Sequence, residues 1–84
     1  NTFTPNGDGI NDRYEVDMTG FKSLVLRVYS MKNDRLVFST NAGAPWTGEG
    51  CEDGMYMVAV EAVTKDGKII SQGKVVWLTR NGTN

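Results

Sequence analysis

The 84-residue sequence contains no histidine, a single cysteine and two prolines. Without histidine the chain lacks the commonest general base, the Ser-His and Cys-His nucleophile pairs and the imidazole ligands of most zinc sites. The single cysteine, Cys51, allows no disulfide within the chain and no thiolate metal cluster. We interpret it as a small apolar residue in a loop, and we expect neither an enzyme nor a zinc domain.

An excess of one charge is also missing. Nine basic residues stand against ten acidic ones, which gives a net charge of -1. A nucleic-acid or anionic-membrane binder would show a basic stripe, so we expect no nucleic-acid partner. No stretch approaches the roughly 18 consecutive apolar residues of a membrane-spanning helix. The start at Asn1 rather than methionine indicates a module of a longer chain.

The length fits one domain, spanning residues 1–84. Its apolar segments are short, rich in β-branched and aromatic residues, and bounded by Gly, Asn, Asp or Pro, which is typical of strands. The predicted strands are Thr2 to Thr4, Arg13 to Met18, Ser23 to Met31, Arg35 to Ser39, Met55 to Thr64, Lys68 to Gln72 and Lys74 to Arg80. No segment favours a helix. The sequence therefore predicts an all-β fold, an immunoglobulin-like antiparallel β-sandwich of about seven strands.

Alternation along the two longest predicted strands indicates which side chains are buried. The even-numbered positions of Met55 to Thr64 form the more apolar face, and the leucine face of Ser23 to Met31 should also point inward. Both strands should be central, because their outer faces are partly apolar as well. The predicted core contains Leu24, Leu26, Val28, Tyr56, Val58 and Val60.

The connections carry recognisable turn chemistry. Asp66-Gly67 between two strand-like runs predicts a tight hairpin, and Asn33-Asp34 predicts another turn. The longest connection, Asn41 to Asp53, contains Trp46, which we interpret as a plug at one end of the sandwich. The alternative is sugar stacking by Trp46 with Tyr56 or Trp77, although Trp77 in the last strand favours packing.

The segment from Asn6 to Asp12 is dense in oxygen-bearing side chains, with Gly7 and Gly9 between them. One interpretation is a weak calcium site, because the spacing resembles part of an Asp-rich calcium loop. Its candidate ligands are Asn6, Asp8, the Ile10 carbonyl, Asn11 and Asp12.

The other interpretation is an ion-free turn in which the Asn and Asp side chains accept hydrogen bonds from nearby backbone N–H groups. The loop lacks the complete Asp triplet and the bidentate Glu of a full calcium loop. Glu15 or Asp17 could complete coordination, but a solvated strand face explains them as well. Calcium is therefore a possible cofactor, and the sequence indicates no other.

The run Thr2-Phe3-Thr4-Pro5-Asn6-Gly7-Asp8-Gly9-Ile10-Asn11-Asp12 resembles the opening signature of the gliding motility-associated C-terminal domain, the type B sorting domain of the type IX secretion system in Bacteroidetes. The similarity continues through nearly the whole chain, in Leu24 to Tyr29, Leu36-Val37-Phe38, Trp46-Thr47-Gly48, Asp53-Gly54-Met55-Tyr56, Asp66-Gly67 and Gly73 to Arg80. Two departures are the turn Ser30 to Asp34, where the family has Asn-Arg-Trp-Gly, and Thr47, where it usually has Asp.

The resemblance implies a C-terminal sorting domain that directs a cargo protein to the cell surface or the medium. Its implied partners are an upstream cargo domain and the outer-membrane translocon with its accessory proteins. The resemblance also implies that the domain is a monomer, that it folds in the periplasm and that the translocon recognises it there. The alternative is an immunoglobulin-like spacer or adhesion module, stiffened by calcium at its junction with the preceding domain. Catalysis is disfavoured, because an 84-residue sandwich offers little cleft for a carboxylate pair.

Overall fold

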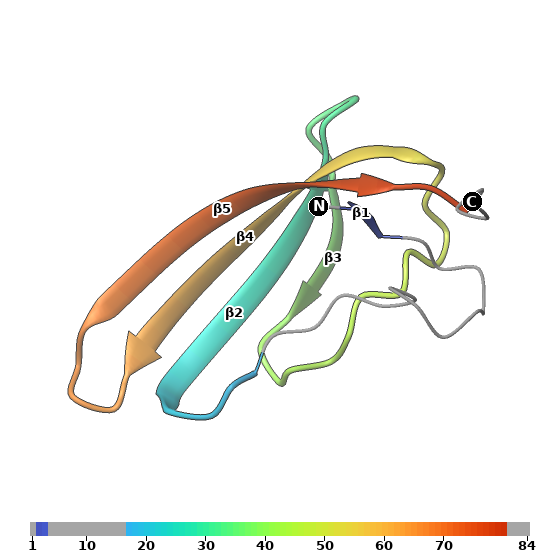
Figure 1. Ribbon diagram of the computed structural model, residues 1–84. Coiled ribbons are helices and arrows are strands. Elements are labelled where there is room, and N and C mark those ends of the chain that lie inside the picture. Colours follow the sequence, from blue (N-terminus) through green and yellow to red (C-terminus); the bar gives the residue numbers. More distant parts are fainter. Residues whose placement is uncertain (1, 4–16, 81–84) are drawn as a thin grey trace.

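A computed structural model of the protein describes residues 2–3 and 17–80. They form one sheet with the strand order β1-β5-β4-β2-β3 (Figure 1). The strands are β1 (Thr2–Phe3), β2 (Phe21–Ser30), β3 (Leu36–Thr40), β4 (Gly54–Thr64) and β5 (Ile69–Leu78). Neighbouring strands are antiparallel except for β1, which is parallel to β5. Within these ranges there is no helix, and therefore none that could span a membrane.

Strands β2 and β4 occupy the centre of the sheet, as predicted. They pair along most of their length, with Leu26 opposite Val60 and Val28 opposite Val58. In both strands buried side chains alternate with more exposed ones. The sheet therefore has an inner face, which carries Leu24, Leu26, Val28, Tyr56, Val58, Ala62, Val76 and Leu78, and an outer face on the other side.

Strand β5 corrects the prediction of two separate strands, Lys68 to Gln72 and Lys74 to Arg80. The chain is continuously paired with β4 from Ile69 to Leu78, and Gly73 lies opposite Ala59 without interrupting the ladder. The sequence predicts a break at Gly73 because glycine commonly bounds a strand. Ser71 to Lys74 are exposed, so polar side chains are tolerated there without ending the strand.

Two further predicted strands lie partly outside the described residues. Thr2 and Phe3 form β1, while Thr4 and residues 13–16 are not described. Asp17 and Met18 are not in a strand: the Asp17 carboxylate accepts a hydrogen bond from the Thr19 N–H at 2.9 Å, which forms a turn before β2. The fold class is thus all-β, but the described part of the chain does not confirm seven strands or an immunoglobulin-like sandwich.

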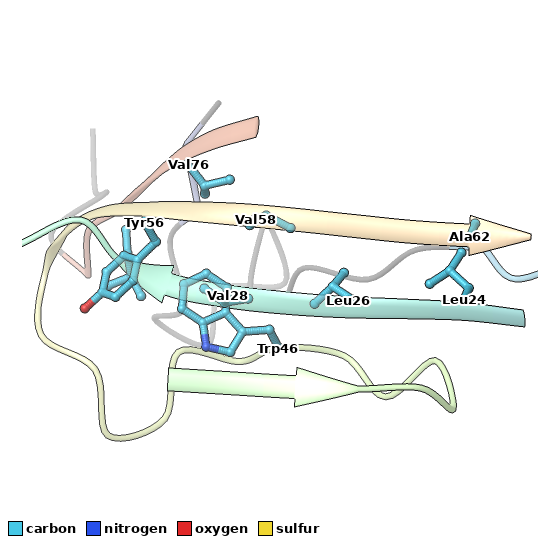
Figure 2. Packing of buried hydrophobic residues seen from close by; sticks show 9 residues of the cluster. Leu24, Leu26, Val28, Trp46, Tyr56, Val58, Ala62 and Val76 are labelled. Atoms are coloured by element: carbon cyan, nitrogen blue, oxygen red, sulfur yellow. The ribbon is translucent and has the colours of Figure 1, made fainter. Parts of the chain in front are cut away.

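The core lies on the inner face. Five of the six predicted core residues are at most 3% exposed, whereas Val60 is only half-buried and packs at the edge of the cluster. Trp46, predicted as a plug, is 2% exposed and belongs to the same cluster. Figure 2 shows its indole at the same end of the cluster as Tyr56, with Leu24 and Ala62 at the other end.

The connection from β3 to β4, residues 41–53, explains why Trp46 reaches the core. Both strands are antiparallel to β2, so they run in the same direction with β2 between them. The chain must therefore return along the whole sheet before β4 can begin, which takes a crossover of about a dozen residues. This crossover places Trp46 against the inner face.

Both predicted turns are present. Gly67 has φ +91° in the turn between β4 and β5, where its N–H donates to the Thr64 carbonyl at 3.0 Å. Asp34 has φ 58° in the turn between β2 and β3, a conformation that Asp tolerates better than most side chains. Its N–H donates to the Ser30 carbonyl at 2.8 Å.

Candidate recognition surface

Residues of the crossover, the start of β4 and the segment after β5 meet at one end of the sheet. We call this group, formed by Trp46, Gly48, Asp53, Tyr56 and Arg80, the sheet-end cluster. Trp46 and Tyr56 form its buried base, with ring centroids 5.2 Å apart at an interplanar angle of 62°. Edge-to-face packing of this kind stabilises aromatic pairs by about 0.5–1.5 kcal/mol beyond their buried area.

Arg80 joins the exposed part of the sheet-end cluster. Its Nη1 is 3.0 Å from Asp53 Oδ1, and its Nη2 donates to the Gly48 carbonyl at 2.7 Å. Its backbone N–H also donates to Asp53 Oδ2 at 3.2 Å. The planar guanidinium can hold both acceptors at once, which the single ammonium of a lysine cannot do in the same geometry. Arg80 therefore fixes the crossover to the end of β5.

A hydrogen bond from the buried Tyr56 side chain also fixes the crossover. The Tyr56 hydroxyl donates to the Glu52 carbonyl at 2.6 Å. Burial raises the pKa of this hydroxyl, and the neighbouring Cys51 shifts it in the same direction. Cys51 itself is half-buried against the core, as expected for an apolar loop residue. Tyr56 is therefore a neutral hydrogen-bond donor at physiological pH.

A polar hollow of about 390 Å³ opens beside the sheet-end cluster, between the crossover and the β2–β3 turn. Its rim carries the ion pair of Lys32 Nζ with Glu52 Oε1 at 2.9 Å, together with Arg35 and Glu49. Small-molecule pockets are mostly apolar and enclosed, whereas this hollow is open and carries charged groups of both signs. Such a surface is better suited to bind another protein than a small substrate.

Trp77 lies on the outer face and is 47% exposed. It is opposite Met55, and Val75 is opposite Met57, which is in turn opposite Tyr29 on β2. The three strands thus present neighbouring apolar side chains to solvent. The alternative of sugar stacking is not supported, because Trp46 is buried and Trp77 is on the opposite face of the sheet from Tyr56.

The predicted calcium ligands Asn6, Asp8, Ile10, Asn11 and Asp12 lie outside the described residues, as does Glu15. Asp17 is described and exposed. Hydrogen bonds from the Thr19 side chain and backbone lower the pKa of its carboxyl. Residues 2–3 and 17–80 contain no group of three or more His, Cys, Asp or Glu that could hold a metal ion.

The sequence identified the individual parts of the sheet-end cluster but not their convergence. Trp46-Thr47-Gly48, Asp53-Gly54-Met55-Tyr56 and the end of the last strand were each recognised as motifs. Once β3 and β4 are placed on either side of β2, the crossover must end at the start of β4. That same end receives the last residues of β5, because β5 is antiparallel to β4.

Comparison with known proteins agrees with this motif set. No curated protein matches the chain. The family model of the CHU_C type IX secretion signal domain matches residues 1–79, which is nearly the whole sequence and includes the motifs around Trp46 and Tyr56. This family consists of secretion signals rather than enzymes. The chain therefore belongs to the CHU_C type IX secretion signal domain family, and its role is that of a C-terminal sorting domain that directs a cargo protein through the type IX secretion system.

Proposed function

We propose that the folded domain is itself the sorting signal, and that the translocon binds it at the sheet-end cluster. Family membership assigns the domain to export of a cargo to the cell surface or outside. The proposal adds the route and the partners. The domain folds in the periplasm, and the outer-membrane translocon with its accessory proteins binds it there as a monomer.

The observation that carries the proposal is the fixation of the sheet-end cluster by Arg80. A sorting signal must present the same surface whatever cargo is attached to it. The polar groups of that surface must therefore be held in place by contacts within the domain. Asp53 and the Gly48 carbonyl are held by one guanidinium, over a base of two packed rings. Asp53 and Arg80 are nevertheless half-exposed, with side-chain exposures of 47% and 38%, so a partner can reach them.

We also propose that the domain has no catalytic activity and binds no nucleic acid. Support comes from the absence of histidine and from the balanced charge of the chain. Three ion pairs in the described part of the chain join strands or loops, for example Arg27 with Glu61 at 2.9 Å. These contacts fit a surface that is shaped for recognition.

The complete residues 1–84 are proposed to form a single immunoglobulin-like sandwich. The support is the unequal burial of the two faces: the residues that are at most 3% exposed gather on the inner face, where a second layer would pack.

The test is export of a periplasmic reporter that carries this domain at its C-terminus, in a cell with a type IX system. We expect the reporter at the surface or in the medium, and deletion of the domain should leave it in the periplasm. Asp53→Asn, which removes the charge that faces Arg80, should reduce delivery several-fold. Glu61→Gln is the matched control, because it breaks another exposed ion pair, away from the sheet-end cluster, and should leave delivery unchanged.

Surface delivery that survives deletion of the domain would refute the sorting function. Equal delivery by the Asp53→Asn and Glu61→Gln reporters would refute the proposal that the translocon binds the sheet-end cluster. Thermal unfolding of both variants shows whether a loss of delivery follows from a loss of fold.

A further inference from the structure

Within residues 2–3 and 17–80, the outer edge of β5 has a long stretch of backbone without a strand partner. Strand β1 pairs only with Trp77 and Leu78 among the ten residues of β5. In the described part of the chain, no other strand lies beside β5 on that side. An exposed strand edge of this kind is a template for one more strand.

The hairpin fixes which β5 residues face that edge. The Thr64 N–H donates to the Lys68 carbonyl at 2.8 Å, so this pair has its backbone groups directed at each other. In an antiparallel ladder such pairs alternate with pairs whose groups point away. The even-numbered residues of β5 therefore bond to β4, and the N–H and C=O groups of Ile69, Ser71, Gly73 and Val75 point to the open edge.

The direction of β1 shows what can occupy this edge. Because β1 is parallel to β5 with Thr2 opposite Trp77, a residue placed directly before Asn1 comes opposite Val75 in the same register. The seventh residue before Asn1 comes opposite Ile69, where β5 begins. A polypeptide that enters the domain from an upstream cargo would therefore meet the open edge first and in parallel register. Figure 1 shows β1 beside the end of β5.

An apolar hollow of about 510 Å³ lies on the inner face along the same edge. Ile70, Gln72 and Lys74 of β5 line it, together with Phe21 and Val60. Paired residues of neighbouring strands share a face, so the second, fourth and sixth residues before Asn1 would lie beside Lys74, Gln72 and Ile70. Apolar side chains at these three positions would fill the hollow.

We infer that the seven residues before Asn1 in a cargo-bearing protein, here called the cargo linker, extend β1 as a strand along Ile69 to Val75. The inference rests on the sorting function, because it requires a cargo upstream. The cargo linker is extended, carries apolar side chains at its second, fourth and sixth positions, and uses the N–H and C=O groups of those same positions to bond to β5. It thereby ties the cargo to the domain at a fixed place and direction.

The experiment is residue-resolved hydrogen–deuterium exchange on the purified cargo-bearing protein. The amides of Ser71, Gly73 and Val75 should exchange at least about tenfold more slowly than solvent-exposed amides. Proline at the second, fourth and sixth linker positions removes the N–H groups that face β5 and should restore fast exchange at these three amides. Proline at the first, third and fifth positions is the matched control, because those N–H groups point away from β5.

Fast exchange of the three amides in the unaltered protein, or the same exchange in both proline variants, would overturn the inference. The amides of Gln72 and Lys74, which face β4, report whether the domain is still folded in each variant. The outcome is separate from the sorting function, because exchange is measured without the translocon. Fast exchange with intact surface delivery refutes only the linker strand, and slow exchange with failed delivery refutes only the sorting function.

Discussion

Replacing one valine on each face of the sheet tests the assignment of the core. Val58 lies on the inner face of β4 and is 1% exposed, whereas Val75 lies on the outer face of the neighbouring strand β5 and is 37% exposed. Val58→Ala removes two buried methylene equivalents at about 0.8 kcal/mol each and leaves a small cavity. We expect the free energy of unfolding to fall by about 2–3 kcal/mol.

Val75→Ala makes the same chemical change on a solvated surface. Only strand propensity and partial burial are lost there, so the expected decrease is below about 1 kcal/mol. A domain of this length has a total stability of roughly 4–13 kcal/mol, and each kcal/mol shifts the thermal midpoint by about 4–8 °C. The two variants should therefore differ by roughly 10 °C in their midpoints.

Thermal and urea denaturation followed by circular dichroism measure both quantities. Val58→Asp, which buries an unpaired charge, should not fold at all, whereas Val75→Asp should fold. Equal midpoints for the two alanine variants, or a folded Val58→Asp protein, would show that the inner face is wrongly assigned.

Three further predictions concern the sheet-end cluster and the N-terminal loop. Burial places the pKa of folded Tyr56 above its unfolded value of about 10, so the contribution of this group to stability should be constant below that pH and fall above it. Tyr56→Phe should therefore reduce the alkaline fall in a pH series of urea midpoints, and it should cost about 1 kcal/mol for the lost hydrogen bond. Arg80→Lys should lower the free energy of unfolding by about 1 kcal/mol. Lys32→Ala, which removes an exposed ion pair with Glu52 of the crossover, should change it little. If Asn6 to Asp12 binds calcium, then calcium but not magnesium should raise the thermal midpoint of the protein. Asp8→Asn should remove this rise. If there is no calcium-specific rise, the segment is better explained as an ion-free turn.

Much of the sheet could be predicted because local chemistry and tertiary structure agree there. The alternation in β2 and β4 is unambiguous, and the Asp66-Gly67 turn needs only the freedom of glycine at positive φ. In β5 the two disagree. Glycine is a poor strand former, so Gly73 favours a break between two predicted strands, and only the pairing with β4 makes the strand continuous there.

The sheet-end cluster could be predicted only in part, because its contacts join residues up to 32 positions apart. The sequence identified Trp46 as a packing residue from its size and its place in a long connection. It could not show that Arg80 contacts Gly48, because that contact depends on the path of the crossover over β2. Such a path is decided by strand order, which alternation alone does not specify.

The position of β5 in the chain has a consequence for quality control during export. Val76 and Leu78, which are 1% and 0% exposed, come near the end of the described residues, and Arg80 follows them. A product that stopped short of these residues would leave the edge of β4 open and the crossover unfastened. If the translocon binds the sheet-end cluster as we propose, cargo whose domain had been cut before Arg80 would not be recognised, so an intact β5 is a condition for export.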